Sequence, residues 1–270
     1  MMEDFSIYNG EGTELRKAQL RMLDMLVEID RICRAHDIPY WLDFGTLLGA
    51  VRHQGFIPWD DDADITVFKS DNARLIRHLT EELPDRYLVV TPDTTGHIKC
   101  TGFIRVVDRH STVVKLSQGE DYEADESDGV CIDIFNVEKG RKWIKKLLAP
   151  LHGRADRRVH KVISDGRLNY VLAWLIYPFT SFAIFLYRLL YKGVNSDMYI
   201  YNIPNFVVRQ MFSQRHRSDI LPVKPMLFEG VELMCPSNPD AFLKETYGDY
   251  MKIPPVEKRV VHAMSISVKE

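Results

Sequence analysis

The stretch PWDDDADITV, residues 58–67, decides the fold of this chain. Successive side chains on a β-strand point to opposite faces, so Asp60, Asp62 and Asp64 are expected to share one face with Thr66. The other face then carries small and apolar side chains that can pack into a core (Ala63, Ile65, Val67). Carboxylates about 6–7 Å apart repel each other unless a counter-charge is present. Because hard divalent cations prefer carboxylate oxygens, the stretch predicts a strand that carries a Mg²⁺ site.

Two other interpretations of the acidic stretch are a solvated surface turn and a calcium loop. An EF-hand loop that started at Asp60 would need Gly at its sixth position, where the chain has Ile65. Its twelfth position prefers Glu, and the chain has Asp71 there. The sequence therefore disfavours an EF-hand and leaves the solvated turn as the alternative.

A second strand, VCIDIF at residues 130–135, has Asp133 inside an apolar run. A lone buried carboxylate is costly unless it is paired or bound to a metal. Two partners are open: an ion pair with Arg105 on a neighbouring strand, or a metal shared with Asp62 and Asp64.

The stretch GTLLGAVRH, residues 45–53, lies directly before the acidic strand. Gly45 and Gly49 let the backbone approach a ligand closely. Thr46 is expected to cap the following short helix, whose N-terminus offers free N–H groups to phosphate. Arg52 and His53 can then contact phosphate oxygens.

The remaining pattern predicts an α+β chain. Besides the short helix after residue 46, helices are expected at residues 14–36 with Thr13 as the N-cap, 70–83 with Ser70 as the N-cap, 206–214, and 239–248 with Asn238 as the N-cap. Strands are expected at residues 39–44, in a stretch ending at 68, and at 87–91, 98–107, 130–137 and 227–234.

Residues 139–187 differ from the rest of the chain. Residues 139–167 hold ten Lys or Arg and two Asp, and residues 168–187 carry no charge. Twenty apolar residues can span a bilayer, but this run includes Pro178 and the aromatic residues that favour a membrane interface. A buried helical hairpin, an interfacial membrane element and a true span are all open.

Composition narrows the class of protein. The chain has 270 residues, 46% hydrophobic and 27% charged, with a net charge of −3, so a disordered chain or a wholly basic nucleic-acid binder is excluded. The four cysteines show no close pairing, and the first residues show no secretory signal. The sequence predicts a cytoplasmic protein.

Three stretches together resemble the LicD family, which is related to the fukutin-type phosphotransferases: WLDFGTLLGAVRHQGFIPWDDDADI (41–65), CIDIF (131–135) and YGDYMKIPP (247–255). The resemblance implies a nucleotidyltransferase-like core of the DNA polymerase beta type, a mixed sheet with helices, in a single domain over residues 1–270. Residues 139–217 are expected to form a helical, partly apolar insertion. In that fold a Gly-Ser or Gly-Thr turn precedes a D-x-D strand and a third Asp comes from a nearby strand, as in Gly45–Thr46, Asp62–Asp64 and Asp133.

The resemblance also implies an activity. The family moves a phosphoalcohol, here first of all phosphocholine, from a CDP-activated donor to a hydroxyl of a cell-surface glycan such as teichoic acid, lipopolysaccharide or a capsule precursor, and CMP is released. Asp62, Asp64 and Asp133 would hold Mg²⁺ or Mn²⁺. Asp60 would act as the base for the sugar hydroxyl or would orient the metal.

Donor binding is assigned to the residues before the acidic strand (Gly45, Thr46, Arg52, His53 and Trp59). Trp59 or Trp41 would stack on cytosine or meet a choline ammonium group, with a core position as the alternative for each. His262 is a further phosphate contact, or it forms a surface pair with Arg259 if that stretch is helical.

Two functions compete with phosphoalcohol transfer. A nucleotidylyltransferase would use the same carboxylates with CTP or ATP and release pyrophosphate, and a non-catalytic scaffold would need no acidic cluster. No nucleic-acid partner is expected. Basic residues attract anionic lipid headgroups, by about 1 kcal/mol each near the surface, so residues 139–192 predict contact with the inner membrane face and with a lipid-linked glycan acceptor.

Overall fold

The computed structural model describes residues 4–91, 103–115, 128–159, 167–192, 196–201, 213–259 and 261–269. Two expected elements lie partly outside these ranges: the strand at 98–107, for its residues 98–102, and the helix at 206–214, for its residues 206–212.

A seven-stranded mixed sheet forms the centre of the protein. Five strands lie side by side in the order β1 (Tyr40–Leu42), β2 (Ala63–Phe68), β6 (Cys131–Lys139), β4 (Ile104–Asp108) and β3 (Tyr87–Val90). Beside the end of β6 the sheet continues with β7 (Met198–Tyr201) and β8 (Gln214–His216). Only β2 and β6 run parallel in this sheet, and the other paired strands are antiparallel. The mixed sheet with its helices confirms the predicted α+β class.

The two central strands form because they can bury apolar side chains on the face opposite their carboxylates. Ile65 pairs in register with Ile134, and both are fully buried, as are Val67 and Ile132. At about 25 cal/mol per Å² of apolar surface, such burial is the main favourable term in folding.

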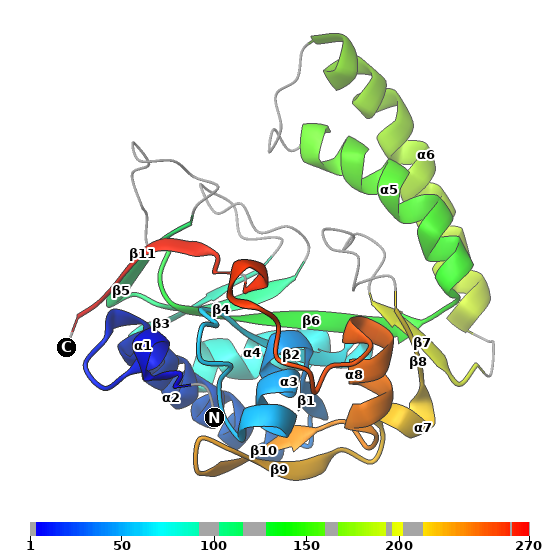
Figure 1. Cartoon of the computed structure of the whole chain (residues 1–270). Coiled ribbons are helices and arrows are strands. Elements are labelled where there is room, and N and C mark those ends of the chain that lie inside the picture. Colours follow the sequence, from blue (N-terminus) through cyan, green and yellow to red (C-terminus); the bar gives the residue numbers. More distant parts are fainter. Residues whose placement is uncertain are drawn as a thin grey trace.

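The helices pack around this sheet. The long helix α2 (Glu14–Ala35) buries an apolar stripe that includes Met22, Leu26 and Ile29, and Thr13 caps it as predicted by accepting from the backbone N–H of Arg16 at 3.2 Å. In Figure 1, α2, α3 (Phe44–His53) and α8 (Pro239–Tyr247) lie below the long strand β6. Asn238 caps α8 as predicted. The short helices are α1 (Ser6–Asn9) and α7 (Arg217–Ile220).

The structure differs from the helices and strands predicted from the sequence at three places. Helix α4 (Asn72–Glu82) follows a 3-10 turn, Lys69–Asp71, so Ser70 is not its N-cap. The strand expected at 227–234 is a hairpin of β9 (Lys224–Phe228) and β10 (Val231–Cys235), because Glu229 and Gly230 both take positive φ and turn the chain. A second pair, β5 (Ser111–Lys115) with β11 (Ala263–Val268), was not predicted. A 3-10 turn, Val256–Lys258, precedes β11.

Helices α5 (Lys142–Val159) and α6 (Arg167–Lys192) pack against each other and project from the end of the sheet near β7 and β8 (Figure 1). The segment 139–217 is therefore only partly helical, because β7 and β8 belong to the sheet. The pairing of α6 with α5 matches the hairpin interpretation of residues 168–187, but the prediction that this hairpin is buried is wrong. Of the 18-residue window of α6 that is apolar enough to cross a membrane, only 22% is buried.

Candidate functional site

The acidic residues lie where the chain leaves α3 and enters β2. Asp60, Asp61 and Asp62 precede the strand, and Asp64 is its second residue. The predicted strand thus begins later than expected, at Ala63. The charge and the side chain of Asp62 act on Asp60, whereas Asp61 contacts His262. Because residues 60–62 precede the strand, their shared face stays a prediction.

Two residues from other elements fix this loop. The amide of Gln19 on α2 donates to the carbonyl oxygens of Ile57, at 3.3 Å, and Asp60, at 3.0 Å. Gly45 lies so close that a Cβ there would come 2.6 Å from Oδ2 of Asp60. The glycine therefore makes room for the Asp60 carboxylate against the first turn of α3. Gln19 was missed, although a glutamine within an apolar stripe is a signal that the sequence offers.

The first turn of α3 is fastened to β2. Asp43, not Thr46, caps the helix: its carboxylate accepts from the N–H of Phe44 at 2.9 Å, from the Thr66 hydroxyl at 2.7 Å and from the Tyr201 hydroxyl at 2.5 Å. The capping role predicted for Thr46 is therefore wrong. Thr46 lies inside the helix, and its hydroxyl accepts from the N–H of Asp64 at 2.8 Å. Both residues hold Asp64 at a defined place beside the helix start.

Asp64, Asp133 and Arg105 form a row across three neighbouring strands. Asp64 on β2 is the register partner of Asp133 on β6, and Asp133 is the partner of Arg105 on β4. The Arg105 guanidinium contacts both oxygens of Asp133, at 2.6 and 3.3 Å. The ion pair weighed from the sequence is confirmed, and a metal-binding role for Asp133 stays a prediction.

Burial and neighbouring carboxylates raise the proton affinity of Asp60 and Asp64. Burial, together with the charges of Asp62 and Asp61, raises the pKa of Asp60 well above its usual range. Burial and the charges of Asp62 and Asp133 do the same to the pKa of Asp64. The cluster therefore holds more negative charge than its own surroundings balance, and a cation bound there would relieve the repulsion.

Asp61 joins the cluster to the C-terminal strand. It accepts from the backbone N–H of His262 at 3.1 Å, from the His262 ring at 3.2 Å, and from the N–H of Ala263. Burial alone would raise the pKa of Asp61, but these hydrogen bonds lower it. His262 also lies 3.7 Å from Asp62. Its stretch is not helical in the described residues, so the i, i+3 helical spacing considered for a pair with Arg259 does not apply.

Arg52 and His53 lie together at the end of α3. The Arg52 guanidinium donates to the carbonyl oxygen of Tyr250 at 2.9 Å and to the His53 ring at 2.9 Å. Burial and the charge of Arg52 lower the pKa of His53 to about 4, so its ring is neutral near pH 7 and accepts this hydrogen bond. Arg52 therefore holds the C-terminal stretch 247–255 against α3, and its phosphate contact stays a prediction.

Both tryptophans proposed for stacking are buried. Trp41 on β1 is fully buried, and Trp59 is 5% exposed. The Trp59 ring packs against Phe5 and Tyr8, and the Arg259 guanidinium lies 4.5 Å from its centroid. These positions are those of core residues, the alternative weighed for each.

Tyr247 is a neighbour of the cluster to which the sequence assigned no role. Burial of its hydroxyl raises its pKa, and the charges of Asp64 and Asp60 add to the shift. Tyr247 is the last residue of α8 and the first of the stretch YGDYMKIPP. This stretch reaches the acidic residues through a contact between distant parts of the chain, which the sequence alone does not show.

The model of the family described as LicD/FKTN/FKRP, nucleotidyltransferase domain, matches residues 37–161, which contain the predicted catalytic, metal-binding and donor-binding residues but not His262. The Lipopolysaccharide cholinephosphotransferase LicD of Haemophilus influenzae is 26% identical over 92% of this chain and 95% of that protein. Residues 37–161 therefore match the LicD family, and the likeness to the Haemophilus protein extends over most of the chain.

Two more distant likenesses are shorter or weaker. The chain is 45% identical to the human Ribitol 5-phosphate transferase FKRP over 40 residues, which cover 15% of this chain and 8% of that protein. A solved Terminal uridylyl transferase 4 from Trypanosoma brucei with bound GTP matches 58% of this chain and 48% of its own at 13% identity, with a TM-score of 0.25 that is too low to bear on the fold.

Two cavities lined by described residues differ in character. One of about 30 Å³ lies at the acidic cluster, between Asp62, Asp133, Arg105 and His262. The other, of about 680 Å³, lies at the base of the α5–α6 hairpin. Its lining includes four basic residues and one acidic residue (Lys69, Lys139, Arg188, Arg217, Glu138).

Proposed function

We propose that the chain transfers a phosphoalcohol, first of all phosphocholine, from a CDP-activated donor to a hydroxyl of a cell-surface glycan, and releases CMP. The activities of two relatives support the reaction: one is a lipopolysaccharide cholinephosphotransferase and one a ribitol 5-phosphate transferase. The observation that carries the proposal is the acidic cluster, in which four carboxylates meet beside a glycine-containing helix start.

The ligand chemistry of the cluster suits a hard divalent cation, although no three of its described carboxylates bring oxygens within 4.8 Å of one another. Asp64 and Asp133 are register partners on adjacent strands, and the raised pKa of Asp64 records uncompensated negative charge. Asp62, Asp64 and Asp133 would hold Mg²⁺, or Mn²⁺, through carboxylate oxygens. Such an ion would supply positive charge to the phosphate oxygens of the donor and to the departing CMP.

Asp60 is the proposed base for the acceptor hydroxyl. Its carboxylate lies against the first turn of α3, in the space that Gly45 leaves open. A base must be ionised, and the nearby charge of Arg52 lowers the pKa of Asp60 and so opposes the larger effect of burial. The alternative, in which Asp60 orients a metal ligand, uses the same position.

Donor phosphates would meet the start and end of α3 and the neighbouring strand. The Thr46 hydroxyl accepts from Asp64, so its proton is available for a phosphate oxygen. Arg105 adds a guanidinium beside Asp133, and Arg52 adds another near Asp60. Phosphoryl transfer depends mainly on such positioning and charge compensation. His53 would hold Arg52, and Trp59 would support this end of the site.

The released product tests the proposal. Purified protein would be incubated with Mg²⁺, a glycan acceptor such as lipopolysaccharide or teichoic acid, and CDP-choline, CDP-ribitol, CDP-glycerol, CTP or ATP, with products followed by ³¹P NMR. CMP formed from a CDP-alcohol and lost in Asp64→Asn supports phosphoalcohol transfer. Pyrophosphate formed from CTP or ATP would instead identify a nucleotidylyltransferase, and the absence of any product together with the absence of donor binding would favour a scaffold.

We further propose that the α5–α6 hairpin holds the enzyme at an anionic membrane surface, where a lipid-linked acceptor would lie. One helix, over Leu168–Tyr191, is long and apolar enough to cross a membrane by length and composition. Its outer surface is apolar, with Phe179 at 77% and Leu190 at 73% exposure. By themselves such residues mark an interaction surface of unspecified kind.

Charge favours an anionic lipid surface over another protein. On α5, the exposed Trp143, Leu147 and Leu151 recur every four residues and so lie on one side of the helix. Exposed basic residues accompany this stripe (Arg141, Lys146, Arg154). The basic cavity at the hairpin base adds positive charge, although Glu138 pairs there with Lys69 at 3.3 Å and Arg188 at 2.9 Å.

Co-sedimentation with liposomes tests the membrane proposal separately from the reaction. We expect binding to phosphatidylglycerol vesicles at low salt, weaker binding to phosphatidylcholine vesicles, and loss of binding in Arg141→Glu/Lys146→Glu and in Phe179→Ser. Lys224→Glu on β9 serves as a matched control for charge and should bind normally. Equal binding of all variants, or no binding at low salt, would overturn the membrane role and leave the transferase proposal intact.

A further inference from the structure

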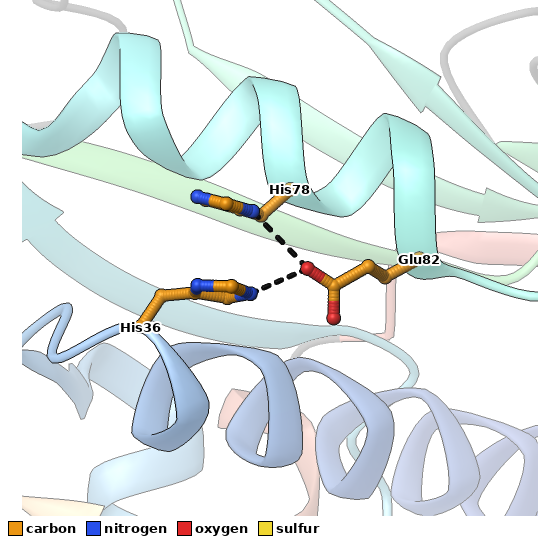
Figure 2. A group of neighbouring side chains, drawn as sticks. All are labelled: His36, His78 and Glu82. Carbon is orange, nitrogen blue, oxygen red and sulfur yellow. Dashed lines mark hydrogen bonds and ion pairs between the residues drawn. The ribbon is translucent and has the colours of Figure 1, made fainter.

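A group of two histidines and a glutamate lies between α2 and α4, apart from the acidic cluster. His36 follows the end of α2, and His78 and Glu82 stand four residues apart on α4. Figure 2 shows both imidazole rings turned towards one carboxylate oxygen of Glu82. The distances to that oxygen are 2.5 Å from Nε2 of His36 and 3.1 Å from Nδ1 of His78.

The chemistry of this group is that of a transition-metal site. One ligand atom from each residue lies within 4.8 Å of the other two, and no other three His, Cys, Asp or Glu residues do so in the described part of the chain. Two imidazole nitrogens and one carboxylate oxygen suit Zn²⁺, which binds them at about 2.0–2.2 Å, and do not suit Mg²⁺ or Ca²⁺. We propose that His36, His78 and Glu82 bind a divalent transition-metal ion, with Zn²⁺ the best match.

The surroundings leave the group accessible to an ion. The three side chains are 29%, 13% and 29% exposed, so water can fill a fourth position. The two rings stack with centroids 3.4 Å apart, so their nitrogens lie side by side at the Glu82 carboxylate. Small rotations of the rings would be needed to direct both nitrogens at one ion.

Three arginines lie near the two histidines and the glutamate, and each is compatible with a bound metal ion. Arg31 lies 3.7 Å from Glu82 but also pairs with Glu28 at 3.0 Å, and Arg74 pairs with Asp71 at 3.1 Å. Arg77 lies 3.0 Å from Nε2 of His78, the ring nitrogen that does not face Glu82. When Nδ1 binds the ion, the proton of the ring moves to Nε2, and the exposed Arg77 side chain turns to solvent.

The site is separate from the proposed donor site. His36 precedes β1, whose first residue, Tyr40, pairs with Val67 near the end of β2. Asp64 lies at the start of β2, and the strand rises about 10 Å between Asp64 and Val67. An ion here would join the ends of α2 and α4, both of which pack beside the sheet. The expected role is therefore structural, and the proposal does not depend on the transferase activity.

Zn²⁺ binding to the full chain tests the inference. The protein would be stripped with a chelator, kept in excess Mg²⁺ so that the acidic cluster is occupied, and titrated with Zn²⁺ by calorimetry and by thermal unfolding. We expect one Zn²⁺ per chain and a rise in Tm of about 5–10 °C at roughly 100 times Kd. His78→Gln and Glu82→Gln should each weaken binding by more than about tenfold.

The exposed His216→Gln is the matched control and should bind Zn²⁺ as the wild type does. A wild type that binds no Zn²⁺ in excess Mg²⁺, or binding that survives in both His78→Gln and Glu82→Gln, would overturn the proposal. If those variants fail to fold, Co²⁺ bound to the wild type decides: visible bands typical of a four- or five-coordinate site with nitrogen ligands support it, and their absence refutes it.

Discussion

Lys145 connects the projecting hairpin to the acidic site. Its side chain is fully buried, and its amine donates to the carbonyl oxygen of Tyr201 at 2.8 Å. The Tyr201 hydroxyl in turn donates to Asp43, the cap of α3. Burial lowers the pKa of Lys145 from its ordinary 10.5 to about 7, although the charge of Glu138 acts in the opposite direction. Replacing this lysine with methionine should therefore change how stability depends on pH.

The sign and size follow from proton linkage. Between the folded pKa of about 7 and the ordinary value of 10.5, the unfolded chain binds more protons at Lys145 than the folded chain, so the free energy of unfolding rises with pH. The slope is at most about 1.4 kcal/mol per pH unit. Between pH 7 and pH 9 the wild type should gain about 2 kcal/mol from this residue, or roughly 4–8 °C in Tm, and Lys145→Met should lose that gain.

Thermal unfolding from pH 6.5 to 9.5 measures this difference, with Lys146→Met, the exposed neighbour, as the control. Loss of the hydrogen bond to Tyr201 leaves a buried carbonyl oxygen unpaired, which adds about 1–3 kcal/mol of destabilisation that does not vary with pH. Only the pH slope therefore reports the titration. If the wild type and Lys145→Met show the same slope, the buried amine does not titrate as reasoned.

Three other substitutions test how the site is held. Thr46→Val should lower stability by about 1–3 kcal/mol, because the N–H of Asp64 loses its acceptor, whereas Thr46→Ser should retain it; chemical denaturation measures both. Gly45→Ala should weaken donor binding in calorimetry, since its Cβ would displace Asp60, and unchanged affinity would contradict that contact. Asp64→Asn should raise Tm by removing a buried like charge while it abolishes Mg²⁺-dependent donor binding, and a lower Tm would count against the repulsion.

Local patterns predicted those parts of the fold that depend on neighbouring residues. Thr13 and Asn238 cap their helices as predicted, because capping depends on adjacent backbone. The spacing of the acidic residues predicted a cluster, and the charges of Asp60 and Asp62 do act on Asp64, although the strand itself begins only at Ala63. For Asp133 the sequence left two partners open, Arg105 or a metal, and the ion pair with Arg105 is present.

Contacts between distant segments were not readable in the same way. Asp43 and Thr46 are both good capping residues three positions apart, and only the pairing of β1 with β2 decides which one caps α3. Tyr247 reaches the cluster from α8, and β11 pairs with β5 across about 150 residues of chain. How much of α6 is exposed depends on which elements pack against it. The apolar pattern of the helix itself therefore does not predict its exposure.

Donor binding tests the central claim most directly, because it needs no acceptor. The Tm of the wild type and of Asp62→Ala would be recorded with Mg²⁺ and each of CDP-choline, CDP-ribitol, CDP-glycerol, CTP and ATP. A CDP-alcohol at roughly 100 times its Kd should stabilise the wild type by about 2.7 kcal/mol, only with Mg²⁺ present and not in the variant. A shift of equal size in Asp62→Ala or without any divalent cation, or no shift with any CDP-alcohol, would contradict the account.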